Sequence, residues 1–349
     1  MHPQERRDLP LRAAERHELR KRSFDAAARL YDKFRPGYPE PLFDDLVRLS
    51  GIPGGGRILE IGPGTGQATL PLARRGFSIV GIEMGASMAR RCRKNLRGFP
   101  NVEIQNVAFE DWKPAENGDC TAPGPTQALR GTVPGFPQGL VADAPKTFDM
   151  VFAATAFHWV ASKAAFTRCA KVLKPHGSLA LCWNFADIPD KTGTVRGKQG
   201  LSRAARSYGA PGTFDASAPR DCPSFSALPG TVPALSDPRF YNDLRAIYHR
   251  IAPGMRLSLP HGPRIERQRK KIVSSGLFGP VTVLRYPWQS EYTADRYIGL
   301  LKTMSDHAIL APRVRRDIFR AIRRLIAANG GSFTRPVVAV LFLAPKRQR

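Results

Sequence analysis

The sequence lacks the features that mark a disulfide-bonded, metal-binding or membrane-spanning protein. Its 349 residues include five scattered cysteines and no C-x-x-C spacing. No disulfide framework and no metal site are therefore expected, and a reducing cytoplasm is the predicted compartment. No apolar run approaches the roughly 18 residues of a membrane span. The first residues also lack the apolar segment of a secretory signal.

Acidic residues are few relative to basic ones. The 29 Asp and Glu residues face 54 Lys and Arg residues, for a formal net charge of +25. A charge of this size suits a nucleic acid, an anionic membrane face or an acidic substrate. The basic residues are nevertheless spread over many segments, which favours a solvated basic surface without a dedicated partner.

Three segments lack the periodic apolar pattern of a packed core. Residues 1–22 mix arginines with acids, which predicts a charged flexible arm and argues against a mitochondrial transit peptide. Residues 115–146 and 187–234 are rich in Pro, Gly and Ala. Long unpatterned stretches inside a compact domain are usually disordered insertions or functional lids. We therefore expect one domain over 23–349 with low-complexity insertions at 115–146 and 187–234.

The remaining chain alternates short apolar strands with helical stretches. Strands are expected at 57–61, 77–83, 102–107, 148–154 and 178–183, and again at 281–286 and 337–343. Helices are expected at 24–34, 41–50, 87–96, 241–250, 264–274, 293–304 and 312–329. Strands separated by helices indicate βαβ units and a parallel sheet, so the predicted class is α/β. The last two strands would extend that sheet at its C-terminal end.

The first strand runs directly into a glycine-rich turn. Glu60 is followed by Gly62-Pro63-Gly64-Thr65-Gly66-Gln67, and a helix is expected to open at Gln67. Glycines at alternate positions allow a sharp turn and the close approach of a ligand to the backbone. Free amides at the start of the following helix suit a polar ligand edge. The spacing G-x-G-x-G differs from the G-x-G-x-x-G of nicotinamide-dependent dehydrogenases, which argues against that class.

An acidic residue ends the second strand, about 20 residues beyond the turn, where an acid commonly meets ribose hydroxyls. This residue is Glu83. A carboxylate accepts both hydroxyl protons and would repel a 2′-phosphate. The expected ligand is therefore an adenosine-like nucleoside with a free ribose.

Two further loops follow strands at the same edge of the predicted sheet. Phe109 and Glu110 follow the third strand, where an aromatic ring can cover an adenine face or simply pack in the core with Trp112. Thr155 to Trp159 follow the fourth strand. Within that loop, His158 is either a catalytic base or a half-exposed structural histidine beside a core aromatic pair.

Together these segments resemble the class I S-adenosylmethionine-dependent methyltransferases, and in particular their bacterial small-molecule branch. The matching stretches are Phe24-Asp25…Tyr31, Arg35-Pro36-Gly37-Tyr38-Pro39, Leu59 to Gly66, Glu83, Phe109-Glu110-Asp111-Trp112 and Ala156-Phe157-His158-Trp159. Similar proteins often carry Asp where Ala108 stands here, so adenine-edge recognition would fall to Glu110 or to backbone amides.

The resemblance implies a Rossmann-like, doubly wound seven-stranded sheet with an antiparallel C-terminal strand hairpin and an N-terminal helical cap. It implies S-adenosyl-L-methionine as the cofactor. The glycine turn would hold its methionine and ribose portions, Glu83 the ribose, and the Phe109 loop the adenine. The predicted cofactor contacts are Tyr31, Glu60, Gly62, Pro63, Gly64, Thr65, Gly66, Gln67, Glu83, Met84, Phe109, Glu110 and Thr155.

The predicted activity is O-, N- or carboxyl methylation of a small, possibly anionic acceptor. The acceptor would face Arg35, Tyr38, Phe157 and Trp159, with His158 as the candidate catalytic base. Two alternatives stay open. One is a nucleic-acid methyltransferase that uses the basic surface, although neither an Asn/Asp-Pro-Pro-aromatic tetrad nor a Pro-Cys pair is present. The other is a non-catalytic protein that binds the cofactor without turnover.

Overall fold

The computed structural model describes residues 27–114, 147–160, 162–186, 238–255 and 261–348. The predicted arm at 1–22 lies outside these ranges, as does the start of the predicted helix at Phe24. The predicted insertions at 115–146 and 187–234 also lie outside them. The assignment of one domain to 23–349 therefore stays a prediction.

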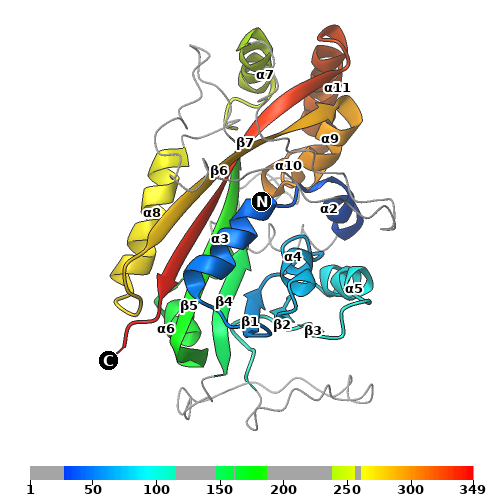
Figure 1. Ribbon diagram of the computed structural model, residues 1–349. Helices are drawn as coiled ribbons and strands as arrows, with labels where there is room; N and C mark the ends of the chain where they lie inside the picture. Colours follow the sequence, from blue (N-terminus) through cyan, green and yellow to red (C-terminus); the bar gives the residue numbers. More distant parts are fainter. Residues whose placement is uncertain (1–26, 115–146, 161, 187–237, 256–260, 349) are drawn as a thin grey trace, which may run out of the picture.

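A seven-stranded sheet in the order β3-β2-β1-β4-β5-β7-β6 forms the centre of the structure (Figure 1). The strands are β1 (Arg57–Ile61), β2 (Ser78–Ile82), β3 (Val102–Gln105), β4 (Phe148–Ala154), β5 (Leu173–Ala186), β6 (Thr282–Thr293) and β7 (Ser332–Pro345). The first five pair in parallel, and β7 runs antiparallel to both β5 and β6. The predicted α/β sheet with a reversed C-terminal hairpin is confirmed.

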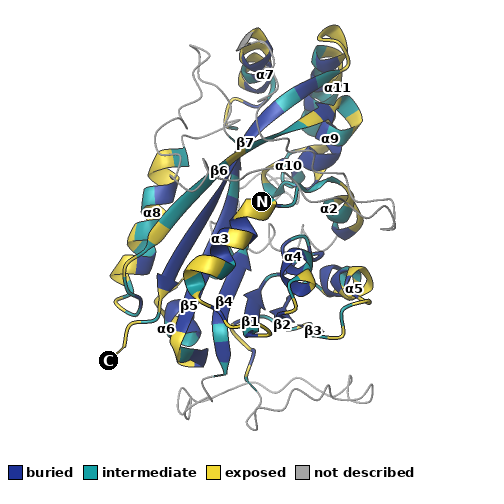
Figure 2. Ribbon diagram, in the orientation of Figure 1, coloured by how far each residue is buried: buried dark blue, intermediate teal, exposed yellow. Residues whose placement is uncertain are grey.

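Helices cover both faces of the sheet, which explains why its central strands are apolar throughout (Figure 2). In β1, Ile58 belongs to one core cluster, whereas Leu59 and Ile61 belong to the other. One face carries α3 (Glu40–Ser50), α4 (Thr69–Arg74) and α5 (Ala86–Asn95). The other carries α6 (Lys163–Val172) and α8 (His261–Ser274).

A third core lies where β6 and β7 extend past the other strands. The long ends of these two strands pack against α7 (Pro238–Ile251), α9 (Ala294–Lys302) and α11 (Pro312–Ala328), with the short α10 (Ser305–Ala308) beside them. The N-terminal helix α2 (Ala28–Phe34) rests on α9. A Cβ at Gly299 would lie 2.6 Å from the Phe34 ring, so the glycine allows this close contact.

Several elements differ from the sequence prediction in length. Strands β5, β6 and β7 are longer than predicted, because polar residues such as Gln289 and Ser290 interrupt the apolar pattern while still pairing with β7. Pro287 is accommodated because β6 is an edge strand. Helix α4 begins at Thr69 rather than at Gln67. Helix α6 is absent from the prediction, although Ser162 caps it by accepting a hydrogen bond from the Ala165 amide at 3.1 Å.

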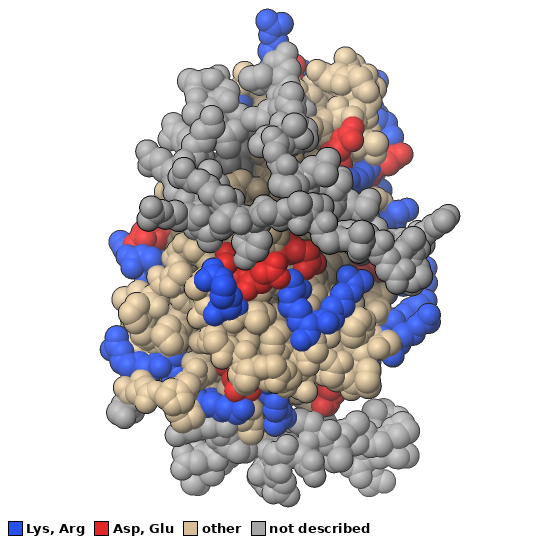
Figure 3. Space-filling view, in the orientation of Figure 1, with Lys and Arg blue, Asp and Glu red and all other residues tan. Residues whose placement is uncertain are grey.

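Two properties of the whole chain bear on its partners. Within the described residues, no helix is long and apolar enough to cross a bilayer. Lysine and arginine side chains stand at separate places on the face shown in Figure 3, with acids between them. The dispersed charge that the sequence indicates is therefore visible on this face.

Removing residues 115–146 tests whether they are needed for folding. The Trp112 and Phe148 rings, each near an end of the segment, lie 6.3 Å apart and belong to the same core, so both ends leave from one part of the domain. Replacing 115–146 by Gly-Ser-Gly should leave a folded protein, stabilised by up to about 2 kcal/mol because loop-closure entropy falls. Thermal unfolding monitored by circular dichroism measures this. Loss of folded protein would show that the segment packs against the domain.

Candidate functional site

The glycine turn after β1 presses against two neighbouring segments. Gly62, Gly64 and Gly66 have φ values of 68, 62 and 96°, in the left-handed region that favours glycine. A Cβ at Gly62 would lie 2.6 Å from the Cβ of Ala156, and one at Gly64 would lie 3.5 Å from the Tyr31 ring. The turn can therefore touch the loop after β4 only because Gly62 lacks a side chain, whereas Gly64 lies at an ordinary contact distance from Tyr31.

Glu83 joins the loops that follow β1 and β2. Its Oε2 accepts a hydrogen bond from the Gly64 amide at 3.0 Å, and its Oε1 accepts one from the Gly85 amide at 2.8 Å. The residue is only 8% exposed, yet it lines a cavity. A carboxylate oxygen has two lone pairs and can accept more than one hydrogen bond, so it can serve both a backbone amide and a ligand hydroxyl.

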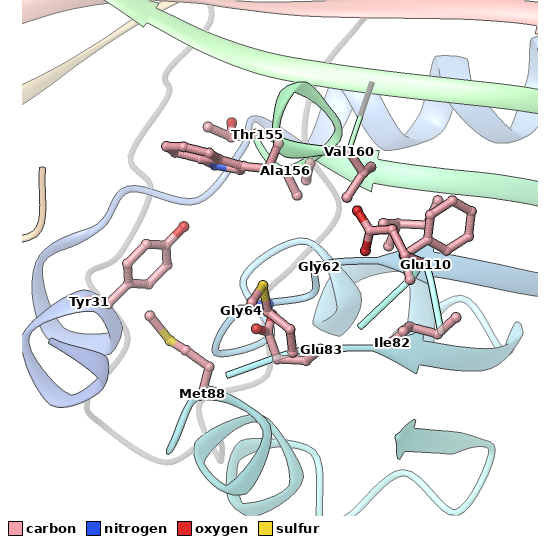
Figure 4. A pocket seen from close by; sticks show the side chains of 15 residues that line it. Tyr31, Gly62, Gly64, Ile82, Glu83, Met88, Glu110, Thr155, Ala156 and Val160 are labelled. Atoms are coloured by element: carbon pink, nitrogen blue, oxygen red, sulfur yellow. The ribbon is translucent and has the colours of Figure 1, made fainter. Parts of the chain in front are cut away.

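This cavity, of about 760 Å³, opens at the carboxyl ends of the parallel strands (Figure 4). Tyr31 faces into it from α2, opposite Thr155 and Ala156, and Glu110 faces it from the loop after β3. Nine residues predicted from the sequence line it, namely Tyr31, Gly62, Gly64, Glu83, Met84, Phe109, Glu110, Thr155 and Trp159. Sequence reasoning missed Ile61, Ile82, Met88, Ala154, Ala156 and Val160.

The missed residues are all apolar, and five of the six adjoin predicted ones, the exception being Met88. Ile61 and Ile82 end their strands next to Gly62 and Glu83, so their backbone reaches the cavity although their side chains belong to the core. Met88 lies in the first turn of α5 and projects toward Tyr31 across the cavity (Figure 4). Its position shortly after Glu83 is a signal that could have identified it.

A second cavity of about 460 Å³ adjoins the first. It shares Tyr31, Gly62, Ala154 and Thr155 with it, and is lined in addition by Arg35, Pro36, Tyr38, Pro63, Gln67, Ala68 and Asn184. The side-chain nitrogen of Gln67 is buried there and has no hydrogen-bond partner. An unpartnered buried donor that borders a polar cavity fits a site that binds an acceptor group of a ligand.

Arg35 brings a positive charge to the second cavity, and its guanidinium is held by Thr303, which does not line that cavity. Its Nε donates to the Thr303 Oγ1 at 2.9 Å, and its Nη2 donates to the Thr303 carbonyl at 3.0 Å. The guanidinium carbon also lies 5.1 Å from the centroid of the Tyr31 ring. Two elements far apart in the sequence, the N-terminal helix and the end of α9, therefore fix this charge.

Thr155 lies at the junction of the two cavities in a strained conformation. Its φ of 53° is unusual for a β-branched residue. Its amide donates to the Cys182 carbonyl at 2.7 Å, and its Oγ1 lies 2.6 Å from the Tyr38 hydroxyl. Burial raises the pKa of Tyr38 well above its usual value, so the phenol is neutral and can donate this hydrogen bond.

Glu60, Thr65 and Gly66 line neither cavity. Glu60 is fully buried, and burial raises its pKa to about 8, with the nearby Thr69 hydroxyl opposing the shift and the Glu83 charge adding to it. Since the folded carboxyl holds its proton more tightly than the unfolded one, its contribution to stability is lost as the pH rises toward about 8. Thr65 is buried, and Gly66 packs against Cys92.

The predicted base and one predicted aromatic also lie outside both cavities. The exposed His158 accepts a hydrogen bond at Nδ1 from the Trp183 indole at 3.3 Å. Phe157 is buried, with its ring centroid 5.1 Å from that of Phe166. Phe109 lines the first cavity and also packs in the core beneath Arg168, so its core packing is confirmed and its contact with adenine stays a prediction.

Comparison with known proteins identifies the family. A family model described as a methyltransferase domain matches residues 31–206, half of the chain. An uncharacterized methyltransferase of Mycobacterium tuberculosis is 29% identical over 174 residues, which are 50% of this chain and 56% of that protein. The chain thus spans about half the length of the curated relatives it matches.

Two solved structures are similar at low sequence identity. Phosphoethanolamine N-methyltransferase 2 of Haemonchus contortus, in complex with S-adenosyl-L-methionine, is 12% identical with a TM-score of 0.42, over 93% of this chain and 57% of that one. The tRNA (m1A58) methyltransferase of Aquifex aeolicus is 12% identical with a TM-score of 0.40, over 91% and 72%.

The residues present fit the cofactor of this family. The Glu83 carboxylate borders the first cavity beside a turn whose glycines allow close approach, which suits ribose hydroxyls. Phe109 adds an aromatic wall, and Gln67 offers an unpartnered buried donor. With this fit and the family match over half its length, the chain belongs to the class I methyltransferases that use S-adenosyl-L-methionine as their cofactor.

Proposed function

We propose that this protein transfers a methyl group from S-adenosylmethionine to a small-molecule acceptor. The observation that carries the proposal is the Glu83 carboxylate, which borders an open cavity of about 760 Å³ beside the glycine turn. The first cavity takes the adenosine end of the cofactor and the adjoining second cavity takes its amino-acid end. The transferred methyl group then lies near the residues that both cavities share.

The adenosine end is held by the loops after β2 and β3. Glu83 accepts hydrogen bonds from the ribose hydroxyls, and Phe109 and Met84 cover the base. Glu110 lines the same cavity and, with Ala108 in place of an aspartate, is the carboxylate available to the adenine edge. Each of these contacts uses a side chain that already borders the cavity.

The amino-acid end meets the polar groups of the second cavity. The Arg35 guanidinium faces a carboxylate there, and the buried amide nitrogen of Gln67 donates to it. The sequence prediction gives Arg35 and Tyr38 to the acceptor. We favour the cofactor for Arg35 because it shares its cavity with Gly62, Pro63 and Gln67 of the glycine turn.

Bound S-adenosylmethionine supplies a methyl group that its sulfonium sulfur already activates. The protein therefore has to align the acceptor and keep water out. The acceptor's lone pair forms the new bond to carbon while the carbon–sulfur bond breaks, and the electron pair stays on sulfur. The Tyr31 and Trp159 rings line the cavity and favour a nearby cation. A base is required only for an acceptor that must lose a proton, and His158 is the candidate for that role.

The choice of acceptor class rests on the two cavities and on the surface charge, rather than on the neighbours. The two similar structures act on different acceptor classes, one of them tRNA, and neither bears on this chain at such TM-scores. Dispersed lysines and arginines on the face in Figure 3 do not form the continuous basic path that a nucleic-acid backbone requires. The charge pattern of this face therefore favours a small molecule as the acceptor.

Glu83→Ala should weaken binding of S-adenosylmethionine by about 1–3 kcal/mol, because hydrogen bonds to a charged acceptor are lost. Isothermal titration calorimetry measures the affinity, and the melting temperature reports on the two loops that Glu83 joins. The matched control is Glu266→Ala, a half-buried acid on α8 that lines neither cavity. Unchanged affinity in Glu83→Ala would remove the carboxylate from the ribose site.

Arg35→Ala should discriminate between two ligands. Binding of S-adenosylmethionine should fall by about tenfold or more, because a charge-assisted pair with the carboxylate is lost. Binding of 5′-methylthioadenosine, which lacks the amino-acid portion, should stay the same in calorimetry. Arg74→Ala, an exposed arginine on α4, is the control. An equal loss of affinity for both ligands would show that Arg35 acts by holding helix α2 in place instead.

Labelled S-adenosylmethionine tests turnover. Incubated with a small-molecule extract, the protein should transfer the label to a low-molecular-weight product, and Glu83→Ala should reduce that transfer. Label in RNA instead would establish the nucleic-acid alternative, and cofactor binding without labelled product would indicate a non-catalytic protein.

His158→Ala should transfer label at close to the normal rate, because its ring lies outside both cavities. A loss of about 100-fold would establish the predicted base.

A further inference from the structure

The third core, between α7, α9, α11 and the ends of β6 and β7, contains an arginine without a counter-ion. Arg335 on β7 is 8% exposed, and its Nε has no hydrogen-bond partner. Among the described residues, no ion pair or hydrogen bond involves its side chain. A buried charge without a partner is strongly destabilising, so such a group usually pairs with an opposite charge.

Two more unpartnered polar atoms belong to the same core. The Tyr292 hydroxyl and the Nδ1 of His307 are buried and have no hydrogen-bond partner. The other ring nitrogen of His307 lies 2.7 Å from the Tyr248 hydroxyl. Tyr292 pairs with Phe333, and Ser290 pairs with Arg335, so Tyr292 and Arg335 are diagonal neighbours on one face of the β6–β7 pair. The Arg335 charge also opposes the rise that burial causes in the pKa of Tyr248 and of Tyr297.

The charge of this polar cluster is positive. Burial lowers the pKa of His307 to about 4, so the imidazole is neutral at physiological pH. Burial also lowers the pKa of Arg264 on α8, and the Asp306 charge opposes the lowering at both His307 and Arg264. Of the buried polar side chains described in this core, the guanidinium of Arg335 is charged, whereas the phenols and the imidazole are neutral.

The position of Arg335 relates it to the methyl-transfer site. Ala186 and Val337 form the last pair at the carboxyl end of β5. Arg335 precedes Val337 by two residues, so it lies beyond that end of β5, at the edge of the sheet where the cavities open. Side chains of alternate residues share one face of a strand, so Arg335 shares a face with Ala339. Ala339 pairs with Asn184, which lines the second cavity. Four residues of strand span about 13 Å.

We propose that Arg335, with the hydroxyl of Tyr292, binds an anionic oxygen group, a carboxylate or a phosphate, and that this group belongs to the methyl acceptor. The guanidinium fork matches either group through two parallel hydrogen bonds. The acceptor is then an anionic small molecule whose charged group lies on the order of 13 Å from the second cavity. The assignment to the acceptor rests on the proposed function, whereas anion binding itself does not.

Thermal unfolding in the presence of succinate or inorganic phosphate, at constant ionic strength and without cofactor, tests the anion site. The melting temperature of the wild type should rise by about 2–4 °C with at least one of the two anions. Arg324→Leu, which removes an exposed arginine of α11, should show the same rise. Arg335→Leu should show none, and without anion it should melt no lower than the wild type.

Tyr292→Phe gives a second measurement, because its hydroxyl has no partner to lose in the free protein. This variant should remain folded and require about tenfold more anion for the same rise in melting temperature. Equal shifts in the wild type and in Arg335→Leu would overturn the site, since the anions would then act on the general basic surface. The absence of any shift in the wild type would overturn it as well.

The link to the acceptor is tested separately. Arg335→Leu should bind S-adenosylmethionine with unchanged affinity in calorimetry, while the KM for the labelled acceptor rises at least tenfold. Unchanged KM together with a lost anion shift would keep the anion site and separate it from the acceptor. If the wild type does not bind S-adenosylmethionine at all, the proposed function is contradicted. The anion site, which the melting experiment tests without cofactor, would still stand.

Discussion

The two hydrogen bonds that the Glu83 carboxylate accepts from Gly64 and Gly85 are the interaction on which the cofactor cavity depends. They fix the turn after β1 against the turn after β2, and every other wall of the cavity is positioned relative to that pair. Gly62 contacts the loop after β4 because the turn is held there, and Tyr31 packs over Gly64 for the same reason. A single buried carboxylate therefore has both an architectural and a ligand-binding role.

Much of the fold follows from local patterns in the sequence. The apolar runs of β1, β2 and β4 are the pattern of strands covered on both faces, and Pro312 and Gly330 bracket the helix α11. Strand ends were harder to predict, because pairing with a long neighbour extends a strand through residues with no pattern of their own. The polar half of β6 is ordered by its pairing with β7, and this partnership is not encoded in the residues of β6.

The candidate site also contains some residues that the sequence predicts and others that it does not. Glu83 and the glycine turn were predictable because the spacing of a strand, a turn and an acid is local and has one physical use. The second cavity was not, since it assembles Asn184 from β5 with Arg35, which Thr303 holds from the end of α9. His158 shows the converse: its place after β4 suggested a base, but its ring turns toward Trp183, away from the cavities. Arg335 gave no sequence signal, because one arginine among many is distinguished only by burial.

The bond between Arg35 and Thr303 has a consequence for the rate at which ligands exchange. Helix α2 covers the cavity with only seven residues, and few backbone bonds of its own hold it in place. Its attachment to α9 through Arg35 and through the Phe34 ring against Gly299 makes the cover part of the C-terminal core. Opening it requires that core to release its hold, so the lifetime of a bound cofactor is set about as much by contacts at residues 299–303 as by those within the cavity.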